Sequence, residues 1–101
     1  MDTTAETPLP MATGTVGAAN EGKLVVVEGR IVGDIADDRP WGWKIYLDDG
    51  SGKLLVFVAS ETGIDVSRLR PGHTLKVAGI SARYQQHVEL LPRTQADISP
   101  P

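Results

Sequence analysis

The sequence predicts an all-β protein, a small closed or nearly closed barrel of five strands. Two segments, 25–32 and 75–81, each have the pattern of a strand interrupted by a glycine, Gly29 in the first and Gly79 in the second. Between them, 45–58 has the pattern of two strands joined by a glycine-rich turn. A glycine inside a strand usually marks a bulge, a bend or a close approach of another backbone. The pattern therefore indicates a sheet that curls on itself, and barrels of this size are mostly binding modules.

Length and composition limit the protein to one domain. The chain has 101 residues and 41% hydrophobic residues, but only 5% aromatic residues, so aliphatic side chains must build the core. It has no cysteine, which excludes disulfides and thiolate metal sites. The net charge is -3, and the first 21 residues contain no lysine or arginine, while 22–98 is formally neutral. Proteins that grip nucleic acid through phosphates usually have a basic excess, which this chain lacks.

The ends of the sequence have the composition of linkers. We expect a flexible linker at 1–12, one domain at 13–98 and a second linker at 99–101. This pattern is typical of a domain cut from a longer parent protein, whose other domains would be partners. No window approaches the roughly 18 apolar residues of a membrane span, and the chain does not begin like a signal peptide. We therefore expect no membrane partner, and the sequence does not indicate a cellular compartment.

The first half of the chain contains three predicted strands. Thr13 to Gly17 is expected to form a short leading strand or a cover over the open end of the barrel. The first long strand is expected at 23–34, where the apolar positions run almost continuously, as in a bent strand that serves two sheet faces. A loop with strong turn chemistry follows at 35–40. The second and third strands, 41–47 and 53–59, flank an Asp-Gly hairpin turn at 48–52.

The second half adds a short helical element and two more strands. Asp65 is placed like a helix N-cap, but Arg70-Pro71-Gly72 ends the element, so we expect one or two helical turns between strands three and four. Its apolar residues would plug the base of the barrel: Ile64, Val66 and Leu69. The fourth strand is expected at 73–83 and the fifth at 87–91, joined by a turn at 84–86.

This order of elements resembles the OB-fold, a five-stranded Greek-key barrel with a short helical turn between strands three and four. The resemblance covers 13–98 and is carried by Val25-x-Val27-x-Gly29, Leu47-Asp48-Asp49-Gly50-Ser51-Gly52, Leu69-Arg70-Pro71-Gly72-His73 and Val88-Glu89-Leu90. The chain looks most like OB domains of the tRNA-anticodon and single-strand-binding type, and like accessory OB modules of large bacterial proteins. OB-folds bind DNA, RNA, sugars and proteins, so the resemblance leaves the ligand open. The last hairpin departs from favoured turn chemistry, since it has Gln85-Gln86 where a tight turn favours Asn-Gly or Asp-Gly.

Strand alternation predicts which side chains face outward. If Ile45, Leu47, Leu54, Val56 and Val58 point into the barrel, the outer face of strands two and three carries the remaining side chains. These are Lys44, Tyr46, Lys53, Leu55 and Phe57. Exposed aromatic rings beside lysines are what an OB-fold uses for single strands, because bases stack on the rings and lysines follow the phosphates. The sequence therefore predicts a nucleic-acid-binding surface here.

We expect further residues at the border of the same surface. Trp41 would be a third stacking platform, and Arg30, Arg39, Arg83 and His87 would line the groove. A structural alternative applies to the aromatic residues, since Tyr and Phe favour strands for packing alone. Phe57 could also be covered by the N-terminal segment, and Trp41 or Trp43 could belong to the core.

Metal binding and catalysis find little support. Asp48-Asp49-Gly50-Ser51-Gly52 lacks the spacing of a calcium loop, and a hairpin turn explains it. Asp34, Asp37 and Asp38 are most simply solvated loop acids, which would repel phosphate. No serine lies in a Gly-x-Ser-x-Gly elbow, and Gly50-Ser51-Gly52 has no following helix to make a phosphate loop. We therefore predict no catalytic residues, no metal and no cofactor.

The sequence favours a non-catalytic module that binds single-stranded nucleic acid weakly, through strands two and three and the adjoining loops. A second hypothesis, favoured by the neutral charge and the acidic first loop, is a protein-interaction or spacer module of a larger protein. Oligosaccharide binding is compatible with exposed aromatic residues but has no feature of its own. Salt dependence separates these hypotheses, because phosphate contacts weaken as salt rises.

Overall fold

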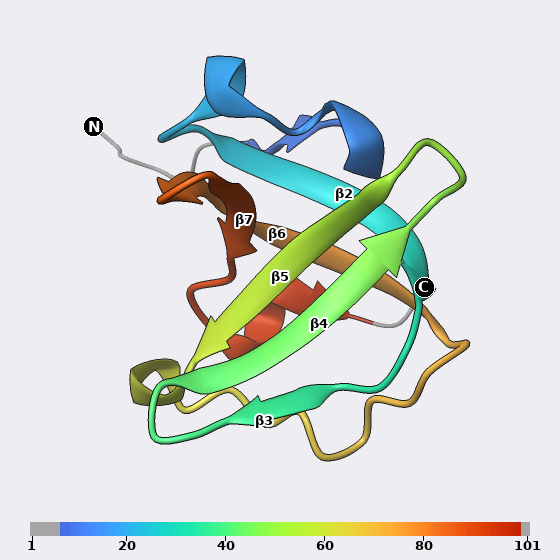
Figure 1. Ribbon diagram of the computed structural model, residues 1–101, viewed down its shortest axis with the longest axis vertical. Helices are drawn as coiled ribbons and strands as arrows, with labels where there is room; N and C mark the ends of the chain where they lie inside the picture. The colour runs from blue at the N-terminus through green and yellow to red at the C-terminus, as the bar shows by residue number, and fades with distance from the viewer. Residues whose placement is uncertain (1–6, 100–101) are drawn as a thin grey trace.

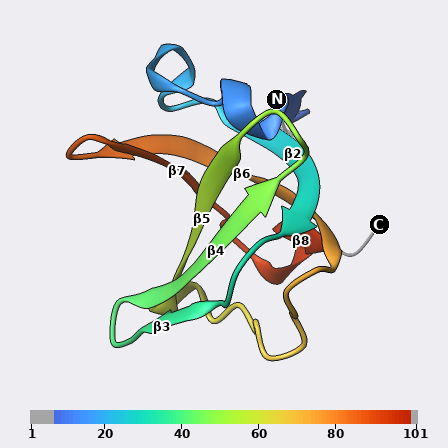
Figure 2. The ribbon, with the colours of Figure 1, turned by 45° about the vertical axis from the view of Figure 1, so that its right-hand side comes forward.

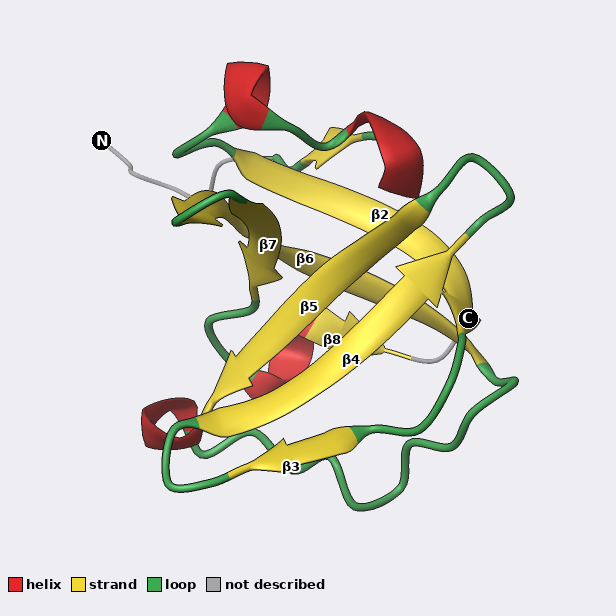
Figure 3. Cartoon of the chain, in the orientation of Figure 1, coloured by secondary structure: helices red, strands yellow, loops and turns green. Residues whose placement is uncertain are grey.

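The computed structural model, which describes residues 7–99, is a closed barrel of five strands (Figure 1). The strands are β2 (Leu24–Ile31), β4 (Gly42–Asp48), β5 (Lys53–Ala59), β6 (Thr74–Tyr84) and β7 (His87–Leu91). They run around the barrel in the order β2-β4-β5-β7-β6, and pairing of β6 with β2 closes it. The β5–β7 pair is parallel and the other four pairs are antiparallel. The all-β prediction is confirmed, and the described helices are only short 3₁₀ turns (Figure 3).

The two strand glycines let backbones approach each other closely, as the sequence predicted. Gly29 pairs with Leu75 of β6, and the next residue, Arg30, pairs with both β6 and β4. A Cβ at Gly29 would lie 3.1 Å from backbone atoms of Asp48. A Cβ at Gly79 would lie 2.6 Å from the carbonyl oxygen of Leu91. Both positions therefore need glycine to bring neighbouring strands together.

Aliphatic side chains from all five strands fill the barrel. The predicted alternation in the central hairpin is confirmed, because its inward residues are buried: Ile45, Leu47, Leu54, Val56 and Val58. Other strands supply Val25, Val27, Ile31, Leu75, Val77 and Leu90. Trp43 is half-buried and packs against this core, whereas Trp41 does not. Removal of this apolar surface from water is the main force that holds a barrel of this kind together.

The segment before β2 is attached to the barrel over more of its length than its composition suggested. β1 (Leu9–Pro10) pairs in parallel with Val25 and Val26, and Met11 packs against the core. At the other end, β8 (Ile98–Ser99), which follows the short η4 (Gln95–Asp97), pairs with β6. Strand pairing thus extends into the two segments that we expected to be linkers, 1–12 and 99–101.

The segment 13–17 forms a cover and not a strand. It contains η1 (Thr13–Thr15), which is followed by η2 (Ala18–Asn20). The buried Thr13 binds the β4–β5 turn: its backbone N–H donates to Asp49 Oδ2 at 3.0 Å, and its Oγ1 accepts from the N–H of Asp49 at 3.1 Å. Thr13 Oγ1 also lies 2.5 Å from the carbonyl oxygen of Gly52, to which it donates. We call this contact the Thr13–Asp49 clasp.

Two loop expectations need correction. The helical turn between β5 and β6 lies at η3 (Ser60–Thr62) and not after Asp65, where we expected it. Asp65 Oδ1 accepts from the N–H of Ser67 at 2.9 Å and closes a turn, so it does not cap a helix. The loop 35–40 also contains a short strand, β3 (Ala36–Asp38), that pairs with β4.

The plug and the last hairpin fit their predictions. Ile64 is buried, and Val66 and Leu69 pack against the core as expected. Tyr84 pairs with His87, so Gln85-Gln86 is a tight two-residue turn. Gln85 has φ 58°, in the left-handed region, which is uncommon for a residue other than glycine. The β6–β7 hairpin projects well beyond the body of the barrel (Figure 2).

No helix among residues 7–99 is long and apolar enough to cross a membrane.

Candidate nucleic-acid interface

A groove of about 630 Å³ crosses the outer face of the barrel beside the projecting hairpin. Its floor comes from β4, β5 and β7, one wall from the β3–β4 turn and the other from the β6–β7 hairpin. Its lining residues are Asp38, Trp41, Lys44, Leu55, Phe57, Tyr84, Gln85, His87 and Glu89. We call this site the aromatic groove, because three ring-bearing segments that are distant in sequence meet there.

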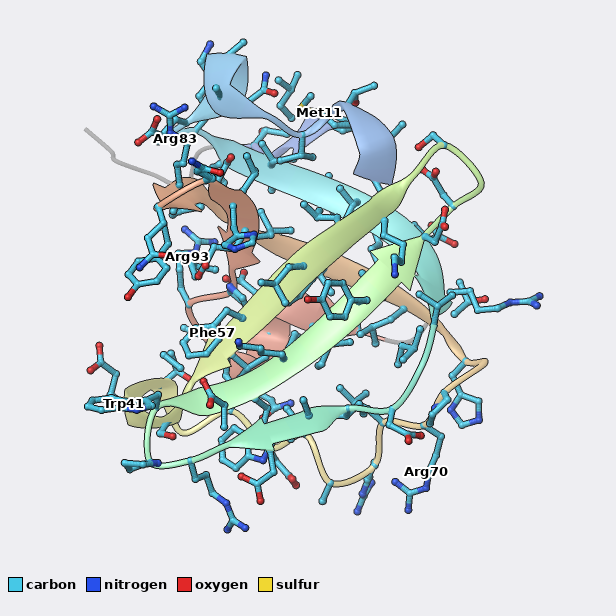
Figure 4. The ribbon with its side chains drawn as sticks, viewed as in Figure 1. Met11, Trp41, Phe57, Arg70, Arg83 and Arg93 are labelled. Atoms are coloured by element: carbon cyan, nitrogen blue, oxygen red, sulfur yellow. The ribbon has the colours of Figure 1, made fainter. Side chains whose placement is uncertain are left out.

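The aromatic rings differ in how far they are exposed. Trp41 is 71% exposed and Tyr84 is 63% exposed, whereas Phe57 is half-buried on β5. Phe57 and Trp41 extend on the same side of the barrel in Figure 4. A single exposed ring is ordinary, but several apolar side chains gathered in one groove often mark a binding site. The groove therefore offers two open rings for stacking and a third, partly covered ring at its floor.

The backbone around Trp41 is fixed on both sides. Its N–H donates to the carbonyl oxygen of Asp38 at 2.9 Å, and its own carbonyl accepts from the N–H of Ser60 at 2.9 Å. The next residue, Gly42, pairs with Ala59 at the end of the β4–β5 ladder. The exposed ring is thus attached to a turn whose backbone is held by hydrogen bonds. Less conformational entropy is therefore lost when a ligand binds there.

The aromatic groove contains charged groups of both signs. Lys44 opposes the carboxylates of Asp38 and Glu89. Partial burial raises the pKa of the Glu89 carboxyl, and the nearby Lys44 and His87 oppose that rise. The groove therefore lacks the basic excess of a strong phosphate-binding cleft.

Four of the nine predicted site residues line the aromatic groove: Trp41, Lys44, Phe57 and His87. Tyr46 and Lys53 lie on the same outer face but nearer the β4–β5 turn. Tyr46 is 37% exposed, and the Lys53 ammonium lies 5.3 Å from the centre of its ring. This cation–π contact occupies part of the ring that we expected to be open for bases.

The three predicted arginines do not join the groove. Arg39 forms an ion pair of 2.6 Å with Asp37, and its guanidinium lies 6.0 Å from the ring centre of Trp43. The hydrogen bonds of this pair lower the pKa of Asp37 and raise that of Arg39. Arg83 lies 4.0 Å from Glu21. These arginines are therefore not among the residues that line the aromatic groove.

Arg30 lies in a different depression of the surface. That depression, of about 540 Å³, also contains Glu28, Asp48, Asp49 and Thr74. Arg30 pairs with Asp48 of β4 on one side and with Thr74 of β6 on the other. It is separated from the aromatic groove because β2 pairs with β4 only near Asp48, at the opposite end of β4 from Trp41.

Sequence reasoning missed Tyr84, Glu89 and Asp38 as groove residues. Tyr84 had a signal, since an aromatic residue beside a tight hairpin turn is exposed unless the hairpin packs against the domain. The positive φ of Gln85 is a second indication, because uncommon backbone conformations concentrate at binding sites. Glu89 could not be assigned to the groove from the sequence, because its position depends on the parallel pairing of Leu55 with Glu89.

No protein-family model matches the chain, and no curated protein matches it. Solved structures do. The chain is similar to the OBody AM1L10 bound to hen egg-white lysozyme, with a TM-score of 0.75 and 16% identity over 98% of both chains. It is similar to asparaginyl-tRNA synthetase from Pyrococcus horikoshii, with a TM-score of 0.73 and 15% identity over 89% of this chain and 21% of that one.

A third similar structure is a replication protein A heterotrimer bound to single-stranded DNA. The TM-score is 0.63 and the identity 16%, over 79% of this chain and 57% of the other. The closed barrel and these matches agree with the predicted architecture. The chain has the OB-fold. Within this OB-fold, β4 and β5 are the second and third barrel strands, and the aromatic groove lies across them between two loops.

Proposed function

We propose that this OB-fold binds single-stranded nucleic acid in the aromatic groove. The observation that carries the proposal is the meeting of Trp41, Phe57 and Tyr84 across β4 and β5, between the β3–β4 turn and the β6–β7 hairpin. OB-folds bind oligonucleotides on the face of their second and third strands, between the loops that flank it. The position and the chemistry of the groove thus agree with the fold's usual binding mode.

The proposed mode of binding is stacking assisted by a small number of charge contacts. Bases stack on Trp41 and Tyr84, each for roughly 1–3 kcal/mol, and such stacking tolerates any base. Lys44 in the groove and Lys53 farther along β5 are placed to contact phosphates. Because acids balance these lysines, we expect weak binding that depends on stacking more than on phosphate contacts. The proposal assigns binding and not catalysis to the groove, in an accessory module of a larger protein.

The test is a fluorescence anisotropy titration with a labelled mixed-sequence DNA strand of about 12 nucleotides, within the site sizes of OB-folds. Trp41→Ala should weaken binding by about five- to 150-fold, since it removes one stacking platform. Leu9→Ala is the matched control, because Leu9 is an apolar side chain 48% exposed outside the groove. Equal affinity of Trp41→Ala and the parent protein would place binding elsewhere.

Salt dependence gives a second readout of the same proposal. Each phosphate contact adds about 0.7 to the slope of log affinity against log salt for a single strand. Lys44→Gln should therefore lower the slope by less than about one unit and leave stacking intact. Absence of binding to any strand at low salt would refute the proposal.

A second candidate function is protein binding through the same groove. Asp38 and Glu89 favour it, because two carboxylates in a groove repel a phosphate backbone but not a protein surface with basic side chains. The similar OBody is described as bound to hen egg-white lysozyme. Binding of a protein partner that nucleic acid does not displace, but that Trp41→Ala weakens, would favour this function.

A further inference from the structure

The carboxylate of Glu89 lies at the floor of the aromatic groove without a partner. Its residue pairs with Leu55 on β5 and with Ala82 on β6, so it stands in the middle of the sheet and not on a loop. It is half-buried, and no hydrogen bond or ion pair reaches it from residues 7–99. A partly buried acceptor to which no protein group donates a hydrogen bond gains free energy when a ligand donor binds it.

The surroundings of Glu89 suit a flat, hydrogen-bonding ligand. Trp41 and Tyr84 stand on the two walls of the groove, and Leu55 and Phe57 form an apolar floor beside the carboxylate. A base that stacks on either wall ring directs its edge toward the floor. A carboxylate at that position accepts hydrogen bonds but donates none when it is ionised. It therefore distinguishes bases by the donors on their edges.

Guanine has the edge that matches a carboxylate. Its N1–H and its N2 amino group are adjacent donors, so both oxygens of one carboxylate can accept from it in parallel. Adenine and cytosine place one amino donor beside a ring nitrogen that is an acceptor, which repels the second oxygen. Thymine and uracil place their single N–H between two carbonyl oxygens, which repel the carboxylate on both sides.

Resting on the proposed function, we infer that the aromatic groove selects an unpaired guanine, whose N1–H and N2–H donate to the carboxylate of Glu89 while the base stacks on Trp41 or Tyr84. The carboxylate of Glu89 disfavours a strong phosphate site, but in this mode it accepts the hydrogen bonds that select the base. Lys44, which also lines the groove, contacts the phosphate beside that base.

The test compares thymidine pentamers whose central base is thymine, guanine, inosine, adenine or cytosine. The guanine pentamer should bind about tenfold more tightly than the all-thymine pentamer, as one bidentate pair provides. The inosine pentamer, which keeps N1–H and lacks the N2 amino group, should fall between them. Equal affinities for all five pentamers would overturn the inference and leave the proposed function intact. No binding of any pentamer, together with no binding of the strand of about 12 nucleotides at low salt, would overturn both.

Substitution of each groove carboxylate in turn shows which of them causes the preference for guanine. Glu89→Gln should bring the ratio of the affinities for the guanine and all-thymine pentamers to about one, and it should raise the affinity for the all-thymine pentamer, since a negative charge near the phosphates is lost. Asp38→Asn is the matched control, because Asp38 is the other carboxylate of the groove. It should keep the preference for guanine. Loss of the preference in Asp38→Asn with its retention in Glu89→Gln would overturn the assignment to Glu89. Unchanged circular dichroism spectra show that both variants fold.

Discussion

The Thr13–Asp49 clasp should contribute measurably to stability although it lies outside the five-stranded barrel. Thr13→Val keeps the shape of the side chain and removes its hydroxyl group. The hydroxyl accepts from the Asp49 N–H at 3.1 Å and donates to the Gly52 carbonyl at 2.5 Å. Two hydrogen bonds at a net 0.5–1.5 kcal/mol each give an expected loss of about 1–3 kcal/mol. Valine leaves no cavity, so the loss reports the hydrogen bonds alone.

Urea denaturation followed by circular dichroism measures this loss. The transition midpoint of Thr13→Val should fall at an unchanged m-value, and the melting temperature should fall by about 4–8 °C for each kcal/mol. Thr94→Val is the control, because Thr94 is exposed and makes no side-chain cap at η4. An unchanged midpoint in Thr13→Val would refute the reasoning, since it would show that water replaces the clasp without loss.

The contribution of Asp49 in this clasp to the stability of the fold should depend on pH. Hydrogen bonds from the Ser51 side chain, and then from the backbone of Thr13 and Ser51, hold the pKa of Asp49 well below its ordinary value. Because the folded pKa is depressed, the stabilisation is present above the ordinary Asp pKa and is lost as pH falls through the folded pKa. The Ser51 hydroxyl group donates to Asp49 Oδ1, so the difference in midpoint between the parent protein and Ser51→Ala should narrow in strong acid.

Two further predictions concern the frame of the barrel. Gly42→Ala should destabilise the fold by at least about 2 kcal/mol, because the added Cβ would lie 2.1 Å from the Val58 carbonyl oxygen. Gly17→Ala is the control, and it should change the melting temperature little, because its Cβ would meet nothing closer than 3.9 Å. A melting temperature of Gly42→Ala equal to that of Gly17→Ala would contradict this. Asp97→Asn should cost about 0.5–1 kcal/mol in urea denaturation at neutral pH, because the Arg93 guanidinium lies 2.9 Å from Asp97 and lowers the pKa of that carboxyl. This contribution is present above the ordinary Asp pKa and is lost as pH falls through the lower folded pKa, so a pH-independent difference would speak against it.

Local chemistry was sufficient to predict the strands of the barrel. The central hairpin has β5 at Lys53–Ala59, the predicted range, and its Asp-Gly turn forms through Asp48 Oδ1, which accepts from the Gly50 N–H at 2.8 Å. Alternation of side chains along a strand is a local property, so it predicted that Ile45 and Leu47 face the core. The short helical turn was misplaced because a 3₁₀ turn has too few residues to leave a periodic signal.

What the sequence by itself determined is the set of strands, their inward faces and the two glycines, Gly29 and Gly79, that let the sheet close. Only the tertiary structure decided which outward residues share a site. The parallel pairing of β5 with β7 and the closure of β6 on β2 bring Trp41, Phe57 and Tyr84 to one groove and leave Arg30 and Arg83 outside it. The reason is physical: alternation fixes which face a side chain is on, but only the register between distant strands fixes what lies next to it.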